Sequence, residues 1–179
     1  MKKYILLVFI VSFLLNCATT QSKANMGYDL VFWGSSAAKV RNVYNIGQEI
    51  QPTYSQNEPN IIKLIQENIS DSIKNRTFLF VEDKLVQVSL LYNDDSDDNV
   101  RNLQTELENK FGDITGYDES LIDNHRLYIK TFVFGQYYPE LIVLLVHAID
   151  RKTTVADGLA VVYIWGKDID INIFSNKLE

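Results

Sequence analysis

The sequence predicts an α+β fold: a single domain, mainly antiparallel sheet, with one amphipathic helix over residues 100–111 packed on one face and a short helix near residues 36–44. Three observations predict this class. Two β-rich runs flank a short polar turn in the middle of the chain. One segment carries apolar residues at helical spacing. Three further β-rich runs follow in the C-terminal half.

The first elements come directly after residue 27. The run 28–33 is short and aromatic-rich, which favours a strand. Gly34-Ser35-Ser36 offers an N-cap for a helix in which Ala37, Ala38, Val40 and Val43 share one face. Residues 45–60 contain Gly47, Pro52 and Pro59 and indicate an irregular connection. Residues 61–73 are ambiguous, because five isoleucines stand near helical spacing but isoleucine also favours strands. We favour the strand.

The middle of the chain gives the clearest patterns. Residues 77–81 and 85–92 should form a hairpin around the polar turn 82–84. The helix over 100–111 follows from one apolar stripe, with Lys110 in its last turn and Gly112 as its stop: Val100, Leu103, Leu107 and Phe111. The C-terminal half should contain three strands, 127–134, 141–149 and 155–165. Residues 141–146 are continuously apolar, as in a central strand covered on both faces.

The N-terminus has the order of an export signal. Lys2 and Lys3 precede an apolar run over residues 4–15, and Cys17 follows shortly after. As a helix this run would cover only about 18 Å, at about 1.5 Å per residue. A bilayer core is about 30 Å thick, so a permanent span is not expected. The expected organisation is a signal peptide over 1–16, a tether over 17–27 and the domain over 28–179.

The segment Leu14-Leu15-Asn16-Cys17 resembles the lipobox of bacterial lipoproteins. The resemblance implies a diacylglyceryl group on the sulfur of Cys17 and cleavage before it. It departs from the usual pattern at Leu15, where the family prefers a small residue, and at Asn16, where it prefers Gly or Ala. An ordinary secretory signal or an uncleaved anchor are the alternatives. Ala18 after the cysteine implies release to the outer membrane, facing the periplasm.

Charge and cysteine content narrow the function classes. Cleavage before Cys17 would remove two of the 17 bases and none of the 23 acids, leaving a net charge of −8. No basic stripe is present, so nucleic acid is not an expected partner. Cys17 is the only cysteine, which excludes internal disulfides. The membrane, reached through the lipid, is the expected partner, together with a protein of the envelope.

Metal and cofactor chemistry have weak support in the sequence. Asp95, Asp97, Asn99 and Glu106 stand at positions 1, 3, 5 and 12 of an EF-hand loop. Val100 occupies position 6, where that loop requires glycine. These carboxylates also stand where they would complement the dipole at a helix N-terminus, which is the reading we favour. His125 and His147 lie in no zinc motif. We expect no metal and no cofactor.

The globular part shows a second resemblance, carried by Phe32-Trp33-Gly34-Ser35-Ser36, by residues 77–88 with their Phe-x-Phe and Asp-Lys-Leu, and by Lys110-Phe111-Gly112. These motifs resemble uncharacterised envelope lipoproteins of bacteria with a WGxS, FxFxxDKLxxV and KFG pattern. The resemblance covers residues 31–112 and implies a fold rather than an activity. The order of strand, capped helix and hairpin is more distantly similar to small lipoproteins that scaffold barrel assembly in the outer membrane, although their Gly-Pro pair is missing.

Aromatic residues supply the candidate contact surface. Tyr137 and Tyr138 stand at a connection between strands, and Tyr128 stands near the start of a strand. Exposed aromatic residues that gather together mark partner surfaces. The alternative, which the pattern favours, is that these residues are half-buried and close the end of the sheet. The expected function is therefore that of a lipid-anchored, non-catalytic envelope protein with a binding or assembly role. The alternative is an envelope hydrolase that uses a carboxylate pair or His147.

Overall fold

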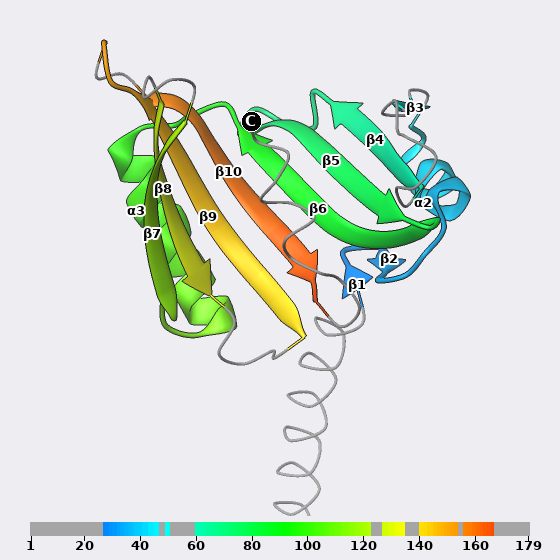
Figure 1. Ribbon diagram of the computed structural model, residues 1–179. Helices are drawn as coiled ribbons and strands as arrows, with labels where there is room; N and C mark the ends of the chain where they lie inside the picture. Colours follow the sequence, from blue (N-terminus) through cyan, green and yellow to red (C-terminus); the bar gives the residue numbers. More distant parts are fainter. Residues whose placement is uncertain are drawn as a thin grey trace, which may run out of the picture.

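The computed structural model describes residues 27–46, 49–50, 60–122, 127–134, 140–153 and 156–166 (Figure 1). The α+β class is confirmed, because antiparallel sheet predominates in these residues and two helices accompany it. The predicted leader, Cys17 and the tether up to Met26 lie outside the described residues. Neither of the two helices is long and apolar enough to cross a membrane.

The described elements follow one another in this order: β1 (Gly27–Tyr28), β2 (Val31–Phe32), α2 (Ala37–Tyr44), β3 (Glu49–Ile50), β4 (Ile61–Glu67), β5 (Ile73–Val81), β6 (Lys84–Tyr92), α3 (Asp97–Phe111), β7 (Gly116–Ile122), β8 (Leu127–Phe134), β9 (Leu141–Asp150) and β10 (Ala156–Trp165). One sheet contains eight of these strands in the order β3-β4-β5-β6-β10-β9-β8-β7. All its pairings are antiparallel, and β1 and β2 form a separate hairpin.

The chain folds as two similar halves. Each half is one helix followed by four strands that pair in sequence, α2-β3-β4-β5-β6 and α3-β7-β8-β9-β10. The last strands, β6 and β10, pair antiparallel in the middle of the sheet, with Tyr163 opposite Val88. This arrangement relates the halves by an approximate twofold axis through the sheet. The central pairing is therefore the seam between two units with the same order of elements.

The two helices also start with a similar sequence. Ser36 caps α2 and is followed by Val40-Arg41-Asn42, and Ser96 caps α3 and is followed at the same spacing by Val100-Arg101-Asn102. Each serine side chain accepts a hydrogen bond from the backbone N–H three residues later, at 3.3 Å in both helices. Both valines are buried against the sheet. The repeated positions are thus those that start a helix and dock its first turn.

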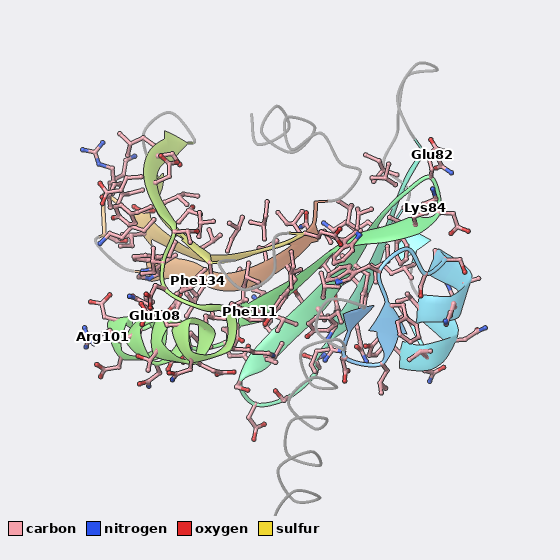
Figure 2. All side chains as sticks on the ribbon, turned by 90° about the horizontal axis from the view of Figure 1, so that it is seen from below. Glu82, Lys84, Arg101, Glu108, Phe111 and Phe134 are labelled. Carbon is pink, nitrogen blue, oxygen red and sulfur yellow. The ribbon has the colours of Figure 1, made fainter. Side chains whose placement is uncertain are left out.

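Both helices cover the same face of the sheet (Figure 2). One buried cluster joins the stripe of α3 to strand residues of the second half: Phe134, Leu141, Val143, Leu145, Leu159 and Val161. A second cluster joins α2 and the β1–β2 hairpin to Leu64, Phe78, Phe80, Leu85 and Val88. Side chains directly opposite one another in a sheet point to the same face. The pairing of Tyr163 with Val88 therefore places both clusters on one face.

Helix α3 begins three residues earlier than the predicted Val100, at Asp97, and it ends at Phe111 as predicted. Ser96 is its N-cap, and Asp97 and Asp98 lie in the first turn, where carboxylates complement the helix dipole. The predicted stripe is confirmed, since Val100, Leu103, Leu107 and Phe111 are all buried. The apolar periodicity predicted the buried face of the helix but not its polar first turn.

The cap gives a testable expectation. Ser96→Ala should lower the free energy of unfolding by about 1 kcal/mol, because the N–H of Asn99 loses its side-chain acceptor. Ser96→Asn keeps an acceptor at this position and should retain most of the stability. Urea denaturation of the three proteins measures the difference. A loss of only a few tenths of a kcal/mol in Ser96→Ala would contradict the role of the cap.

The β5–β6 hairpin is confirmed with a tighter turn than predicted. Val81 pairs with Lys84, so the turn consists of Glu82 and Asp83 alone, with positive φ at both (50° and 58°). Two-residue turns of this kind usually contain Asn or Gly. Here both carboxylates are bound. Asp83 Oδ1 accepts from the N–H of Ala37 at 2.8 Å, and Glu82 Oε1 accepts from the N–H of Asn60 at 2.9 Å. The turn therefore holds the start of α2.

The bounds of the other predicted strands agree with the structure in part. Residues 61–67 form strand β4, so the extended interpretation is confirmed there, while residues 68–72 form a turn before β5. The strand predicted over 28–33 is instead the two short strands β1 and β2, joined by Asp29 and Leu30. Strand β7 was not predicted. The strands predicted over 127–134, 141–149 and 155–165 are present within one residue of their bounds.

Candidate functional site: a groove at the seam of the two halves

A groove of about 510 Å³ opens on the helix-covered face, between the elements that cover the two halves. The β1–β2 hairpin and the residue after it contribute Gly27, Tyr28, Asp29 and Trp33, the first half contributes Arg76, and the second half contributes Lys110, Phe111, Leu141 and Tyr163. Its volume lies in the range of pockets that bind small molecules. The groove exists because α2 and α3 dock on opposite ends of the sheet and leave its centre partly uncovered.

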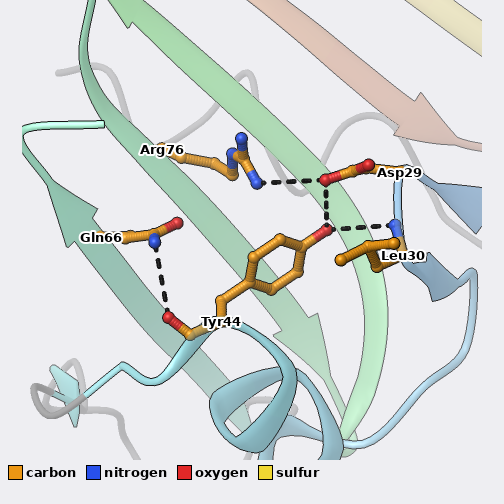
Figure 3. Close-up of polar contacts among 5 residues, drawn as sticks. All are labelled: Asp29, Leu30, Tyr44, Gln66 and Arg76. Carbon is orange, nitrogen blue, oxygen red and sulfur yellow. Dashed lines mark hydrogen bonds and ion pairs between the residues drawn. The ribbon is translucent and has the colours of Figure 1, made fainter. Parts of the chain in front are cut away.

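Arg76 is one of the charged residues that line the groove, and Figure 3 shows its contact with Asp29. It lies on β5 in phase with Phe78, so its side chain points to the core face and is only 12% exposed. Its Nη1 lies 3.6 Å from Oδ2 of Asp29, which is an ion pair longer than a hydrogen bond. The guanidinium also lies over aromatic rings, 4.9 Å from the ring centre of Tyr44 and 5.4 Å from that of Tyr28.

Tyr44 joins this ion pair to α2. Its hydroxyl donates to Oδ2 of Asp29 at 3.2 Å and accepts from the N–H of Leu30 at 3.3 Å. Its backbone carbonyl accepts from Nε2 of Gln66 at 3.4 Å (Figure 3). Burial is the main reason why the pKa of Tyr44 is raised to about 12. The network therefore holds the β1–β2 hairpin, α2 and β5 together along one side of the groove.

Two buried N–H groups at the groove have no acceptor. The Nε–H of Arg76 and the Nε1–H of Trp33 are both buried and make no hydrogen bond. Leaving a buried donor unsatisfied costs about 1–3 kcal/mol. Natural structures contain few such groups, and those at functional sites often have a ligand as their partner. Two of them beside one groove indicate a place for an oxygen acceptor.

Aromatic rings form the rest of the wall. The ring of Tyr163 lies 5.2 Å from that of Tyr28 and 6.0 Å from that of Phe111. Trp33 stacks on Trp165 at 6.0 Å with an angle of 13° between the rings. Burial raises the pKa of Tyr28 and of Tyr163, so both phenols stay neutral at physiological pH. The wall offers flat apolar surface and neutral hydroxyl groups.

Of the tyrosines proposed as partner contacts, Tyr128 is described and Tyr137 and Tyr138 lie outside the described residues. Tyr128 lines a hollow of about 420 Å³ with Leu121, Ile149 and Arg151, beside the edge strand β7. Leu121 is 43% exposed. A hydrogen bond with Glu119 raises the pKa of Tyr128. This hollow is mostly apolar and is separate from the seam groove.

Two of the four residues weighed as metal ligands, Asp97 and Asn99, lie at the start of α3. Asp97 lies in the first turn, and Asn99 donates through its backbone N–H to Oγ of Ser96. Asn99 Nδ2 donates to the carbonyl of Asp94. Asp95 and Glu106 take no part in these bonds. No group of three or more His, Cys, Asp or Glu side chains placed to hold a metal ion occurs in the described part of the chain.

His147 lies on β9, on the helix-covered face, and is 3% exposed. It pairs across the sheet with Lys130 and with Leu159. Its Nε2 is buried and has no hydrogen-bond partner. His147 does not line the groove. His125, the other histidine, lies outside the described residues.

The sequence analysis did not propose the groove residues as a site, although one of them left a signal. In residues 73–81 the alternation that places Phe78 and Phe80 inward also places Arg76 inward. A charged residue at an inward position of a strand indicates a function or a buried partner. Tyr28, Trp33, Lys110 and Tyr163 left no such local signal, since only the pairing of β6 with β10 brings the two halves together.

The fold and the groove thus define an α+β domain of two helix-and-four-strand units with a candidate binding site at their seam. No family model matches this chain, and comparison with curated proteins and with solved structures finds no similar protein.

Proposed function

We propose that this chain is a lipid-anchored protein of the bacterial cell envelope, and that its domain is a non-catalytic binding module. The observation that carries the binding role is the seam groove, in which two buried N–H donors lack acceptors beside aromatic walls. Pockets with a few convergent polar groups on an apolar surface are typical of binding sites. The groove is therefore the binding site of the proposal.

The anchoring part of the proposal rests on the order of charges, apolar run and Cys17 at the N-terminus. A diacylglyceryl group on Cys17 together with further acylation gives stable membrane attachment. Ala18 after the cysteine favours the outer membrane, with the domain in the periplasm. Gly27 borders the groove and follows Cys17 by only ten residues. The groove would then lie close to the membrane surface.

The chemistry of the groove favours binding over hydrolysis. A nucleophile is activated by a lowered pKa or by a neighbouring base. The pKa values of Tyr28 and Tyr163 are instead raised by burial. Among the described lining residues Asp29 is the one carboxylate, and it is paired with Arg76. These features suit the recognition of a ligand by hydrogen bonds and ring contacts.

The hollow around Tyr128 supports a second candidate role, the assembly with an envelope protein. It lies beside β7, an edge strand of the sheet in the described residues. Tyr117 and Leu121 on this strand are 51% and 43% exposed. Exposed apolar side chains beside an open edge suit a protein partner that adds a strand. This surface and the groove could be occupied at the same time, because no residue lines both.

The anchoring is tested at Cys17. Cys17→Ser should abolish labelling by an alkyne analogue of palmitate and should release the protein from the membrane fraction, because serine provides no thiol for the lipid. Mass spectrometry of the native chain should find a lipidated cysteine at its N-terminus. Asn16→Gly is the matched control, which brings the segment closer to the lipobox and should leave labelling intact or increase it. An unmodified thiol or an intact leader would contradict the proposal.

A further inference from the structure

We propose that the seam groove binds a small anionic ligand, with a carboxylate or phosphate group carried on a flat apolar body. This inference rests on the groove being a binding site, and it adds the chemical class of the ligand. It follows from three features of the lining: its donors, its charge and its aromatic wall.

The donors select an oxygen acceptor. The Nε–H of Arg76 and the Nε1–H of Trp33 are buried and without acceptors. Indole and guanidinium nitrogens can only donate. An ammonium group has no lone pair to accept from either donor, whereas an oxygen of a carboxylate or phosphate can accept from one. Hydrogen bonds between a guanidinium and an anionic oxygen are also among the stronger ones in proteins.

The charge of the lining has the sign that favours an anion. The chain carries a net charge of −6, yet the groove is lined by Arg76 and Lys110 against the single carboxylate of Asp29. Asp29 satisfies Arg76 poorly, because the ion pair is 3.6 Å long and its carboxylate is 49% exposed. A ligand anion could approach the guanidinium closely enough to hydrogen-bond, which Asp29 does not do.

The aromatic wall selects the body of the ligand. The ring of Tyr163 lies 5.2 Å from that of Tyr28 and 6.0 Å from that of Phe111, and all three residues line the groove. Flat apolar groups gain most from contact with such rings. Leu141 extends this surface. The volume of about 510 Å³ is suited to a ligand of small-molecule size.

Tryptophan fluorescence can report ligand binding in the groove. Trp33 and Trp165 are the two tryptophans of the chain, and they stack on each other at 6.0 Å. Trp33 lines the groove. A ligand that accepts a hydrogen bond from its indole N–H should change the intrinsic fluorescence. The signal then comes from this pair alone.

The test uses the full chain in nonionic detergent, titrated with four probes of similar size. Benzoate and phenyl phosphate carry the anion on a flat ring, benzyl alcohol is the neutral analogue and benzylamine the cationic one. Both anions should give saturable fluorescence changes, with affinities at least about tenfold higher than those of the other two. That factor corresponds to the gain of one hydrogen bond to a charged group.

Variants assign the binding to the groove. Arg76→Met should weaken benzoate binding at least about tenfold, and Lys110→Met should weaken it by a smaller factor. Lys39→Met is the matched control, because Lys39 lies over the ring of Phe32 outside the groove lining. Asp29→Asn should strengthen benzoate binding, since it removes the competing carboxylate from Arg76. If Arg76→Met does not fold, Lys110→Met and Asp29→Asn still give opposite expected signs.

The outcomes separate the ligand class from the binding role. Equal or tighter binding of benzyl alcohol or benzylamine would overturn the anionic class and leave the groove as a binding site. No saturable change with any probe would overturn both. The full chain in vesicles of phosphatidylglycerol, compared with phosphatidylcholine, distinguishes a lipid headgroup from a soluble anion as the source of the phosphate. A fluorescence change in phosphatidylglycerol alone assigns the headgroup, and saturation by phenyl phosphate in phosphatidylcholine assigns a soluble ligand.

Discussion

Leu145→Ala is expected to lower the free energy of unfolding by about 3–5 kcal/mol, the range for a fully buried leucine in a well-packed core. Leu145 is 0% exposed and lies in the cluster that joins α3 to β9 and β10. Its neighbour Leu144 has the same chemistry but points to the other face, where it is only half-buried. Leu144→Ala should therefore cost about 1–2 kcal/mol, since less apolar surface is lost from burial.

Urea denaturation of the two variants and of the unchanged chain measures this difference. The pair is matched in residue type, strand and substitution, so backbone and propensity effects cancel. A loss of 3–5 kcal/mol is a large part of the stability of an ordinary domain, and Leu145→Ala is expected to be partly unfolded at 37 °C. Equal losses in both variants would contradict the one-sided core, because they would mean that the two faces are packed alike.

The strands of the C-terminal half could be predicted because each has a long apolar run between polar breaks. Strand β7 was missed for a physical reason. It is an edge strand, and its exposed residues Tyr117, Asp118 and Glu119 have no apolar run to distinguish them from a loop. Pairing with β8 over seven residues makes it a strand. Such pairing is a tertiary interaction, which local sequence does not contain.

Residues 61–73 are a second segment in which strand pairing, rather than local sequence, decides the structure. Their isoleucines satisfy helical spacing, but residues 61–67 pair with β5 along their whole length, from Ile61 opposite Val81 to Glu67 opposite Asn75. Pairing places Ile62 and Leu64 on the core face. The preference of isoleucine for strands therefore predicted this segment correctly. The segment could become a strand because β5 of the β5–β6 hairpin has a free edge with which β4 pairs.

The similarity of the two halves was readable in part. The spacing Ser-x-x-x-Val-Arg-Asn occurs at 36–42 and again at 96–102. It marks two helices that start alike. The strands of the halves share no such motif, and β3 has two residues where β7 has seven. Since the groove is formed where the halves meet, its residues come from five separate parts of the chain. Composition and spacing therefore predicted a domain with a binding role but not this site.

Alkaline pH is expected to destabilise the domain, and Tyr163 is one of the tyrosines responsible. Burial is the largest cause of its raised pKa, followed by the neighbouring Tyr28 and Tyr92 and by Glu106. Below pH 10 the phenol is neutral in both the folded and the unfolded chain, so it contributes no pH dependence. Above pH 10 the unfolded chain releases the proton that the folded chain retains. The free energy of unfolding then falls by about 1.4 kcal/mol per pH unit for each tyrosine that behaves in this way.

Tyr92 contributes in the same direction, since burial raises its pKa to about 12, and its contribution ends as the pH passes that value. Tyr163→Phe should remove the contribution of Tyr163 and flatten the slope between pH 10 and pH 11. Near pH 8 the free energy of unfolding of both proteins should not change with pH through Tyr163. This range is the internal control. Urea denaturation at half-unit steps from pH 8 to pH 11 measures both slopes. Parallel slopes for the variant and the unchanged chain would contradict a buried, neutral phenol at the seam, because the proton of Tyr163 would then be lost equally from both states.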